Sequence, residues 1–541
     1  MSADESTDDS EQQTEEQPAE QTEEQPVDSD QPAAQSDEQP TDSSQPSAQS
    51  DDAPADSDQS NERPAEESDQ PADQSDEQPA GETDQPAEQS DDQAAEQSDN
   101  KSDSSDSDSE GAEQPTDAFG STKVALAEAE GGGGAGVGGG SDKRAGPAMS
   151  PFPAAQFPDL VRDTGKLKAG FIAAMGEVKA DGSLMTGLVD VDGKPLDVEK
   201  IPMAIASLNL DGTTSVIGQH DVTEMFFSGS LLKIAAMYAA FQLRHAVNDL
   251  AGTLDANLPI PDFFKKVRAT FDPQIKNAVK LLTDRGFHQV PKYETIFTPT
   301  LGGDGKYTVA FRSDADPKFD FQHHLQEMVV NSHNPSAGLV IQSLGYNLIN
   351  GVLEKGGFFR NNSTGIWLAG DYLPNPVPNT TFPEFVEERA LGLVGGNVVT
   401  IASLNDGPVK QVTTCIDPVK MFVLLANEQL VSNPHDSDDT ANADMLKMTA
   451  DAVTGAGAPS RFTRAVPLPA FTVLNCKIGL GELKGGGVCP NFRCVTSEVS
   501  ILQHASGRQF VTMFQNINVA GGRHFHMIAE IFQRTMDKFL S

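Results

Sequence analysis

The sequence predicts an α+β domain that follows a long, disordered acidic tail. Two observations predict this fold class. Segments with strand character stand near both ends of residues 151–541, and segments with helical character fill the middle. Strands from the two ends of a domain can meet in one sheet, with an internal helical part beside it. We therefore expect one mixed domain over residues 151–541 and no folded domain over residues 1–150.

The negative charge of the chain is concentrated in its first part. The protein has 541 residues and a formal net charge of −43. Residues 1–150 hold 42 of the 81 acidic residues and 5 of the 38 basic residues, which leaves 39 acids and 33 bases for the remainder. No run of cations is available to displace phosphate counterions, so the composition excludes a nucleic-acid-binding protein that works through a basic surface.

Residues 1–118 are of low complexity, with irregular repeats of the type EQPAEQ and no aromatic residue before Phe119. Such a segment cannot bury enough apolar surface to offset the roughly 1–2 kcal/mol of backbone entropy lost per ordered residue. We expect it to be disordered, either as a plain spacer or as an interaction tail whose partners are unknown. The run GGGGAGVGGG at 131–140 is typical of a flexible linker.

The first thirty residues contain neither a basic region nor an apolar core, so no signal peptide is visible. No apolar run approaches the roughly 20 residues that span a bilayer, so we expect no membrane span. The expected location is the cytoplasm by default, with the cell envelope or secretion open if the start site or export route differs.

Along the domain, a helix is expected first, at 168–177. Strands follow at 202–210 and 214–218, separated by an Asp-Gly turn at 211–212. Residues 231–250 then predict a helix. Its sequence begins LLKIAAMYAAFQL, which is apolar at almost every position, so this helix should be buried.

The second half predicts more helices and then a closing group of strands. Helices are expected at 262–285, 323–330, 336–353, 418–430 and 444–453. The chain should end with strands at 471–478, 495–503 and 509–516, followed by a helix at 525–540.

The segment SLLK, from Ser230 to Lys233, opens the apolar helix. Residues at i and i+3 share a helix face, so the Lys233 amine can approach the Ser230 hydroxyl. A partly desolvated lysine loses proton affinity and becomes a plausible base towards the serine. The first turn of a helix also offers free N–H groups to a developing oxyanion. The segment therefore predicts a nucleophile and its base.

Two further short motifs follow in order. In SHN, Ser332 and Asn334 precede the helix expected from 336, so a hydroxyl and an amide can point into one cleft. In KIG, Lys477 lies at the end of a strand, where its charge would favour an anionic substrate group. Gly479 in the same motif would let a substrate approach the backbone closely.

Each motif taken singly has a plain structural explanation, such as a capping serine, a turn before a helix or a lysine on an edge strand. The tail itself contains SDNK at 98–101, which matches both SxxK and SxN in a segment with no fold to hold it. Order, spacing and setting distinguish the three motifs of the domain, and together they favour a catalytic site.

The three motifs resemble those of the penicillin-recognising serine hydrolases, which include the class A β-lactamases and D-Ala-D-Ala peptidases. The likeness covers roughly residues 200–541. It is carried by FFSGSLLKIAAMYAAFQL, MVVNSHNPSAGLVIQSLGYNLINGVLEKGGF, VTTCIDPVKMFVLLANEQLVS and KIGLGELKGGG. The resemblance implies an antiparallel sheet flanked by helices, a helical subdomain, and a site between them that uses no cofactor.

By position, the resemblance implies a role for each motif residue. Ser230 would form the acyl-enzyme and Lys233 would activate it. Ser332 and Asn334 would relay protons and contact a substrate amide, and Lys477 would bind a carboxylate.

The third motif also implies an oxyanion hole, formed by the backbone N–H groups of Ser230 and Leu480 beside Gly479. Three departures from the family pattern matter. His333 replaces the commoner middle residue of the second motif. Ile478 replaces the usual hydroxyl residue and so removes a donor to a substrate carboxylate. Glu388 only faintly matches the deacylating glutamate of the class A enzymes, and without such a base an acyl-enzyme would hydrolyse slowly.

The leading hypothesis is therefore a serine hydrolase that forms an acyl-enzyme with a small-molecule or peptide substrate. The substrate would be an amide or ester bearing a carboxylate, of the β-lactam or peptidoglycan type. One alternative is a catalytically inactive relative that serves as a binding or scaffold module, and another is an esterase unrelated to the cell wall.

The four cysteines all lie after residue 414, too few for a disulfide-stapled fold. Cys489 and Cys494 could pair, or could bind a metal with Cys476, but no second ligand pair has zinc-like spacing. Structural thiols and no metal are expected.

Overall fold

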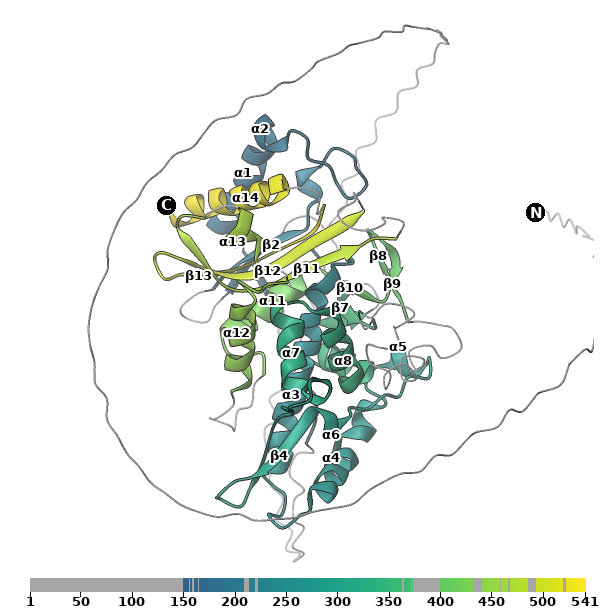
Figure 1. Cartoon of the computed structure of the whole chain (residues 1–541). Helices are drawn as coiled ribbons and strands as arrows, with labels where there is room; N and C mark the ends of the chain where they lie inside the picture. Colours follow the sequence, from purple (N-terminus) through teal and green to yellow (C-terminus); the bar gives the residue numbers. More distant parts are fainter. Residues whose placement is uncertain are drawn as a thin grey trace, which may run out of the picture. The chain divides into compact units, whose positions relative to one another are not determined.

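The computed structural model describes residues 149–541 apart from 155, 158–159, 164, 209–213, 219–221, 362–363, 371, 373–398, 432–439, 458, 466–467, 485–492 and 519–521. Within the described residues, a six-stranded sheet lies between a pair of helices on one face and a larger helical part on the other (Figure 1). The expected α+β class is confirmed. The Asp-Gly turn expected at 211–212 lies outside the described residues.

The sheet joins strands from both ends of the domain. Its order is β1-β3-β2-β13-β12-β11. All neighbouring strands are antiparallel except the short edge pair β1 and β3. The bounds are β1 Val161–Arg162, β2 Met203–Leu208, β3 Thr214–Gly218, β11 Phe471–Glu482, β12 Cys494–His504 and β13 Gln509–Asn518. Because β2 pairs with β13, the early and late strands meet as predicted, and the unexpected parallel β1 only extends one edge.

One face of the sheet is covered by α1 (Lys166–Ala180) and α14 (Gly522–Leu540), which pack against each other (Figure 1). The short α13 (Arg461–Ala465) packs against α14. Phe171 of α1 and Phe532 of α14 share one buried cluster with Phe510 of the sheet. The opposite face carries α11 (Ile416–Ala426), so the central strands are covered on both sides and are buried at almost every position.

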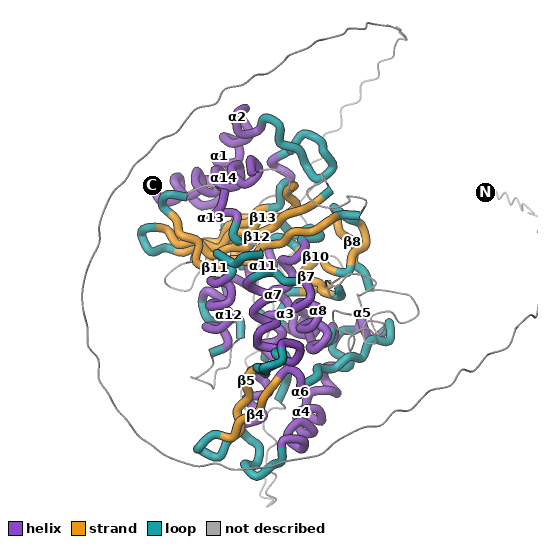
Figure 2. Tube along the Cα trace, in the orientation of Figure 1, coloured by secondary structure: helices purple, strands orange, loops and turns teal. Residues whose placement is uncertain are grey.

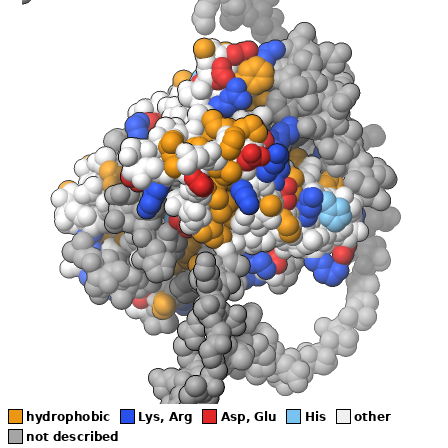
Figure 3. Space-filling model, turned by 90° about the horizontal axis from the view of Figure 1, so that it is seen from below, with side chains coloured by type: hydrophobic (Ala, Val, Ile, Leu, Met, Phe, Trp, Pro, Cys, Tyr) orange, Lys and Arg blue, Asp and Glu red, His pale blue; other side chains and the backbone are white. Residues whose placement is uncertain are grey.

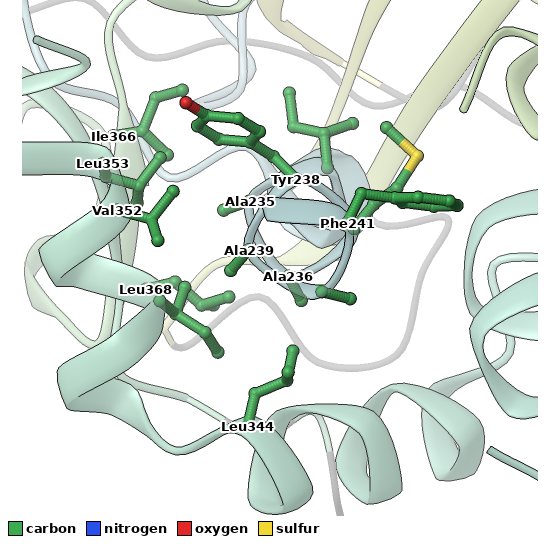
Figure 4. Packing of buried hydrophobic residues seen from close by; sticks show 14 of the residues in the cluster. Ala235, Ala236, Tyr238, Ala239, Phe241, Leu344, Val352, Leu353, Ile366 and Leu368 are labelled. Carbon is green, nitrogen blue, oxygen red and sulfur yellow. The ribbon is translucent and has the colours of Figure 1, made fainter. Parts of the chain in front are cut away.

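The helical part is built around α3 (Lys233–Ala251), which is buried along nearly its whole length. Small side chains on α3, such as Ala236 and Ala239, face large apolar residues of neighbouring elements, among them Leu344 and Leu353 (Figure 4). The neighbours are α4 (Ile260–Ile275), α7 (Phe321–Val330), α8 (Asn334–Leu344), α9 (Tyr346–Lys355) and α12 (Ala441–Asp451). Burial on all sides explains why the sequence of α3 is apolar throughout.

Two expected helices are each divided in the structure. The stretch expected at 262–285 forms α4 and then the separate short α5 (Lys280–Thr283). The stretch expected at 336–353 breaks into α8 and α9 at Gly345, whose φ of 79° no right-handed helix accommodates. Apolar periodicity continues across the break, so the pattern alone predicted one helix.

Several short elements were not expected from the sequence (Figure 2). They are the helices α2 (Gly182–Met185) and α6 (Tyr293–Ile296), the hairpins β4 (Phe297–Leu301) with β5 (Tyr307–Phe311) and β8 (Ile401–Ser403) with β9 (Gly407–Val409), and the small sheet of β6 (Phe359–Asn361), β7 (Thr364–Leu368) and β10 (Gln411–Thr413). The strands among them span five residues or fewer, so they show too little periodicity to predict.

The face shown in Figure 3 carries hydrophobic side chains along its middle, with charges of both signs around them. This mixture agrees with the nearly balanced charge of the domain. Every helix formed by described residues falls short of the length and apolar character that a bilayer-spanning segment requires.

The packing of α1 on the sheet can be tested with two neighbouring residues. Phe171 is 1% exposed, whereas Ile172 is 58% exposed. We expect Phe171→Ala to lower the free energy of unfolding by about 3–5 kcal/mol, because it empties a cluster shared with α14 and the sheet. Ile172→Ala should change it by less than about 0.5 kcal/mol. Urea unfolding measures both, and equal effects would contradict this packing.

Candidate active site

Ser230 lies on a 3₁₀ turn and not on the α-helix that the sequence predicted. The turn η2 spans Gly229–Leu232, and α3 begins immediately after it at Lys233. A 3₁₀ helix has three residues per turn, so side chains at i and i+3 eclipse each other. The tighter turn therefore stacks Ser230 over Lys233 more directly than an α-helix would.

The third motif packs against this turn with backbone on backbone. A Cβ on Gly229 would lie 2.3 Å from the Leu480 carbonyl oxygen, and Gly229 has a φ of 58°. A Cβ on Gly479 would lie 2.0 Å from the Ser228 carbonyl oxygen and 2.8 Å from the Leu231 nitrogen. Only glycine fits at either position, so the two glycines bring the edge strand β11 directly beside the turn that carries Ser230.

Two side chains of the sheet form hydrogen bonds with Ser228, the residue that precedes the turn. Ser497 Oγ donates to the Ser228 carbonyl at 2.9 Å, and Ser228 Oγ donates to Gln515 Oε1 at 3.0 Å. All three side chains are buried. Gln515 sits where the register between β12 and β13 shifts, which marks a β-bulge.

Asn516, the next residue of the bulge, is linked through Asn405 to the backbone of Phe227, which precedes the turn. Asn516 has a φ of 60° and accepts a hydrogen bond from Asn405 Nδ2 at 3.0 Å. Asn405 also binds both backbone groups of Phe227, accepting from the nitrogen at 2.9 Å and donating to the oxygen at 3.1 Å. The bulge therefore fixes the chain on its way into the serine turn.

Lys233 is fully buried, and its amine is bound by the second motif. Nζ donates to the Ser332 carbonyl oxygen at 2.5 Å and to Asn334 Oδ1 at 2.7 Å. Ser230 Oγ forms no hydrogen bond with Lys233 or with any other described residue. The structure thus joins the lysine of the first motif to the second motif, and leaves the serine hydroxyl unengaged within the described part of the chain.

Ser332 joins the second motif to the third. Lys477 Nζ donates to Ser332 Oγ at 2.8 Å and to the Ile478 carbonyl oxygen at 3.1 Å. Ser332 adopts a φ of 57°, an unusual conformation for a residue other than glycine. This conformation turns the Ser332 carbonyl to Lys233 and its hydroxyl to Lys477, so that one residue bridges the two amines.

Burial changes the protonation of both lysines. Loss of hydration lowers the pKa of Lys233 to about 6, and the nearby charge of Lys477 acts in the same direction. Burial lowers the pKa of Lys477 to about 8. At pH 7, Lys233 is therefore mostly neutral and Lys477 mostly charged. A neutral amine has two N–H groups and one lone pair, and the two acceptors of Lys233 occupy both N–H groups.

Of the residues that depart from the family pattern, the structure describes Ile478 and His333. Ile478 is 1% exposed and packs with Ala452 and Cys476 in a small apolar cluster. His333 is exposed, and its Nδ1 lies 2.9 Å from Ser336 Oγ at the start of α8, so it is engaged away from Lys233. Glu388 lies outside the described residues.

Tyr372 is a site residue that belongs to none of the predicted motifs. Its ring centre lies 4.7 Å from Lys233 Nζ, and its hydroxyl donates to the Gly229 carbonyl oxygen at 3.1 Å. No signal in the sequence points to it. Ser497 and Gln515 were also missed, because each stands in a strand that holds several other polar residues and the sequence does not distinguish them.

The cysteines differ from the expectation in one respect. Cys494 is disulfide-bonded, so its interpretation as a structural thiol is wrong, and pairing, an alternative that the sequence left open, applies to this residue. Cys415 and Cys476 are free and buried, as expected. Among the described residues, no group of three or more His, Cys, Asp or Glu side chains is arranged to hold a metal ion.

No protein-family model matches the sequence, and no curated protein matches it either. Solved structures with similar folds include a β-lactamase from Chitinophaga pinensis, at 13% identity and a TM-score of 0.36, which covers 68% of this chain and 98% of that one. The TLA-3 extended-spectrum β-lactamase has 11% identity and a TM-score of 0.37, covering 69% and 100%. A variant of PBP-A, in an acyl-enzyme complex with penicillin G, has 13% identity and a TM-score of 0.34, covering 68% and 97%. Likeness at this level assigns neither activity nor substrate to this chain.

The contact between β11 and the serine turn can be tested with one methyl group. We expect Gly479→Ala to lower the free energy of unfolding by about 1–3 kcal/mol, because the new Cβ overlaps the Ser228 carbonyl oxygen. Gly303→Ala is the control, since a Cβ there meets nothing within 4 Å. Its stability should be unchanged or slightly raised. If both variants unfolded like the unsubstituted protein in urea, β11 would not lie against the turn.

Proposed function

We propose that this protein is a serine hydrolase that forms an acyl-enzyme on Ser230. The observation that supports it most is the hydrogen-bonded chain from Lys233 through Ser332 to Lys477. This chain lies beside the turn that carries Ser230 and beside the edge strand that would supply an oxyanion donor. Such a set of nucleophile, base and proton donor is what acyl transfer requires.

In the proposed acylation, the free lone pair of neutral Lys233 takes the proton of the Ser230 hydroxyl. Ser230 Oγ forms a bond to the substrate carbonyl carbon, and the carbonyl oxygen gains the negative charge. The N–H groups of Ser230 and Leu480 would stabilise this charge, since the first turn of a helix and the outer side of an edge strand both leave N–H groups without internal partners.

Collapse of the tetrahedral intermediate breaks the bond to the leaving nitrogen or oxygen. Ser332 Oγ, which Lys477 holds at 2.8 Å, would deliver its proton to the leaving atom. The proton that Lys233 took from Ser230 would then pass to Ser332, so that Ser332 regains its hydroxyl and Lys233 is neutral again. Attack of water on the acyl-enzyme would then release the acid and return a proton to Ser230. No described residue other than Lys233 stands ready as a base for this water, so deacylation should be slower than acylation.

Lys477 suits a carboxylate-bearing substrate. A charged amine has three N–H donors, and two of them serve Ser332 Oγ and the Ile478 carbonyl. The third N–H has no acceptor among the described residues and would bind an anionic group of the substrate. The proposed substrates are therefore amides or esters with a carboxylate, including β-lactams and peptidoglycan-type peptides.

A second candidate is a binding or scaffold module that has lost catalysis. Two observations favour it: Ser230 Oγ has no hydrogen-bond partner among the described residues, and Ile478 removes a hydroxyl donor. An esterase unrelated to the cell wall would share the chemistry and differ in substrate, which a panel of esters and β-lactams would separate.

Covalent labelling tests the nucleophile. We expect a fluorescent penicillin or a fluorophosphonate to label the intact protein and to leave an adduct on Ser230 that mass spectrometry detects. Ser230→Ala should abolish the adduct. Ser506→Ala, at an exposed hairpin position, should label like the unsubstituted protein. Absence of labelling in the intact protein, or an adduct that persists in Ser230→Ala, would leave the scaffold module as the better account.

The two lysines predict a bell-shaped dependence of acylation on pH. Acylation needs neutral Lys233, so kcat/KM should rise with pH through about 6. Binding of a carboxylate needs charged Lys477, so kcat/KM should fall as pH rises through about 8. The alkaline limb should disappear for a neutral ester that lacks a carboxylate, while the acid limb remains. Lys447→Gln, at an exposed position, should leave both limbs unchanged. A profile without either limb across this range would contradict these assignments.

A further inference from the structure

Tyr372 connects the proposed base to the turn that carries the proposed nucleophile. Its ring centre lies 4.7 Å from Lys233 Nζ, and its hydroxyl donates to the carbonyl of Gly229, the residue before Ser230. Tyr372 is half-buried and packs against the main apolar cluster. One side chain therefore touches both ends of the segment on which the proposed chemistry depends.

The groups that surround the Lys233 amine come from the second motif, from β11 and from Tyr372. The second motif supplies the Ser332 carbonyl and the Asn334 amide, which bind the two N–H groups of the neutral amine. From β11, Lys477 is the charged group that acts on Lys233. Tyr372 adds an apolar ring face, and burial keeps the pKa of its phenol well above the usual range, so it stays neutral. No described acid compensates a charge on Lys233, so the exclusion of water decides its protonation.

The ring can act on Lys233 in two opposite ways. Its π face attracts an ammonium group, which would favour the charged amine. Its bulk excludes water, which favours the neutral amine. The Lys233 amine is fully buried beside this ring, and burial is the main cause of its lowered pKa of about 6, so we infer that the exclusion of water is the larger effect of the ring. The π face would then receive the ammonium that forms when the amine takes the proton of Ser230.

The backbone of Tyr372 supports a positioning role. Its φ of 61° is rare for a residue other than glycine, asparagine or aspartate, and such a conformation persists only where the surroundings hold it. The described contacts that hold it are those to Gly229, Lys233 and the apolar cluster. The contacts that keep this conformation are thus the same ones that touch the proposed site.

We propose that Tyr372 is a positioning residue that excludes water from the amine of Lys233 and holds the backbone of the turn that carries Ser230 in place. This inference rests on the proposed function. The ring and the hydroxyl have separate tasks: the ring covers the base, and the hydroxyl anchors the backbone before the nucleophile.

The two tasks are separated by two substitutions. Tyr372→Phe keeps the ring and removes the hydrogen bond to Gly229, so acylation should fall about 2- to 10-fold at every pH with the acid limb unmoved. Tyr372→Asn removes the ring, and asparagine accepts a positive φ. We expect its acid limb to move up by about one pH unit or more, so that this shift reduces acylation about tenfold at pH 5 and about twofold at pH 7. As pH rises further, the deficit should shrink to the loss that Tyr372→Phe also shows.

A second readout follows the amine without catalysis. In full-length Ser230→Ala protein with ¹³C-labelled lysine, the NMR signal of Lys233 is assigned by its loss in Lys233→Met. Its titration midpoint should stay near pH 6 when the residue at 372 is tyrosine and also in Tyr372→Phe, because the ring covers the amine in both. The midpoint should rise by about one unit or more in Tyr372→Asn, where water reaches the amine. Should Tyr372→Asn fail to fold, Tyr372→Gly carries the same expectation, since glycine also accepts this backbone.

The outcomes separate the two proposals. Absence of labelling in the intact protein, together with the expected midpoints in the Ser230→Ala series, would defeat the serine hydrolase and leave the effect of Tyr372 on Lys233 intact. An equal Lys233 midpoint with tyrosine, phenylalanine and asparagine at position 372 would overturn the role of Tyr372. A uniform fall in acylation for Tyr372→Asn, with its acid limb where the unsubstituted protein has it, would overturn it as well.

Discussion

The burial of the Lys233 amine governs the other features of the site. A lysine amine without an acidic partner is costly to bury in its charged form, and the cost falls when the amine is neutral and its N–H groups are bound. Here the Ser332 carbonyl and the Asn334 amide bind those groups. The apolar surroundings of α3 that exclude water also lower the pKa of the amine, so the packing of the helical part and the chemistry of the site have one cause.

The sheet and the helical part meet at this site through two glycines. Gly229 and Gly479 let β11 and the serine turn approach with backbone against backbone, and side chains from the centre of the sheet hold the entry to that turn. The site residues thus come from both parts of the domain, and neither part holds the arrangement alone. Polar residues inside the sheet, which would be a liability in a plain core, are bound here to the segment that leads to Ser230.

The departures from the family pattern do not disturb the hydrogen-bonded chain. His333 is bound at the start of α8, while its neighbours Ser332 and Asn334 keep their contacts to Lys233. The side chain of Ile478 lies in an apolar cluster, and its carbonyl oxygen accepts a hydrogen bond from Lys477. Under the proposed function, their effect would be to leave Lys477 as the main anchor for an anionic group of the substrate. The proposed acylation would then favour substrates that a single cation can orient, with slow release of the acyl group.

The elements with long periodic patterns and the residues with distinctive chemistry could be predicted without the structure. The strands at both ends, the apolar helix α3 and the three motifs each depend on neighbours within a few positions of the chain, so local pattern is enough to find them.

The contacts that assemble the site arise only when the chain folds. Lys233 binds the Ser332 carbonyl 99 residues away, Lys477 reaches the hydroxyl of the same serine across 145 residues, and Tyr372 covers the amine. Local pattern carries no record of such contacts, since they form when segments far apart in the chain pack together. The 3₁₀ turn at Ser230 and the break at Gly345 belong to the same class: each is imposed by the backbone's surroundings or by a single φ angle, and apolar periodicity passes over both.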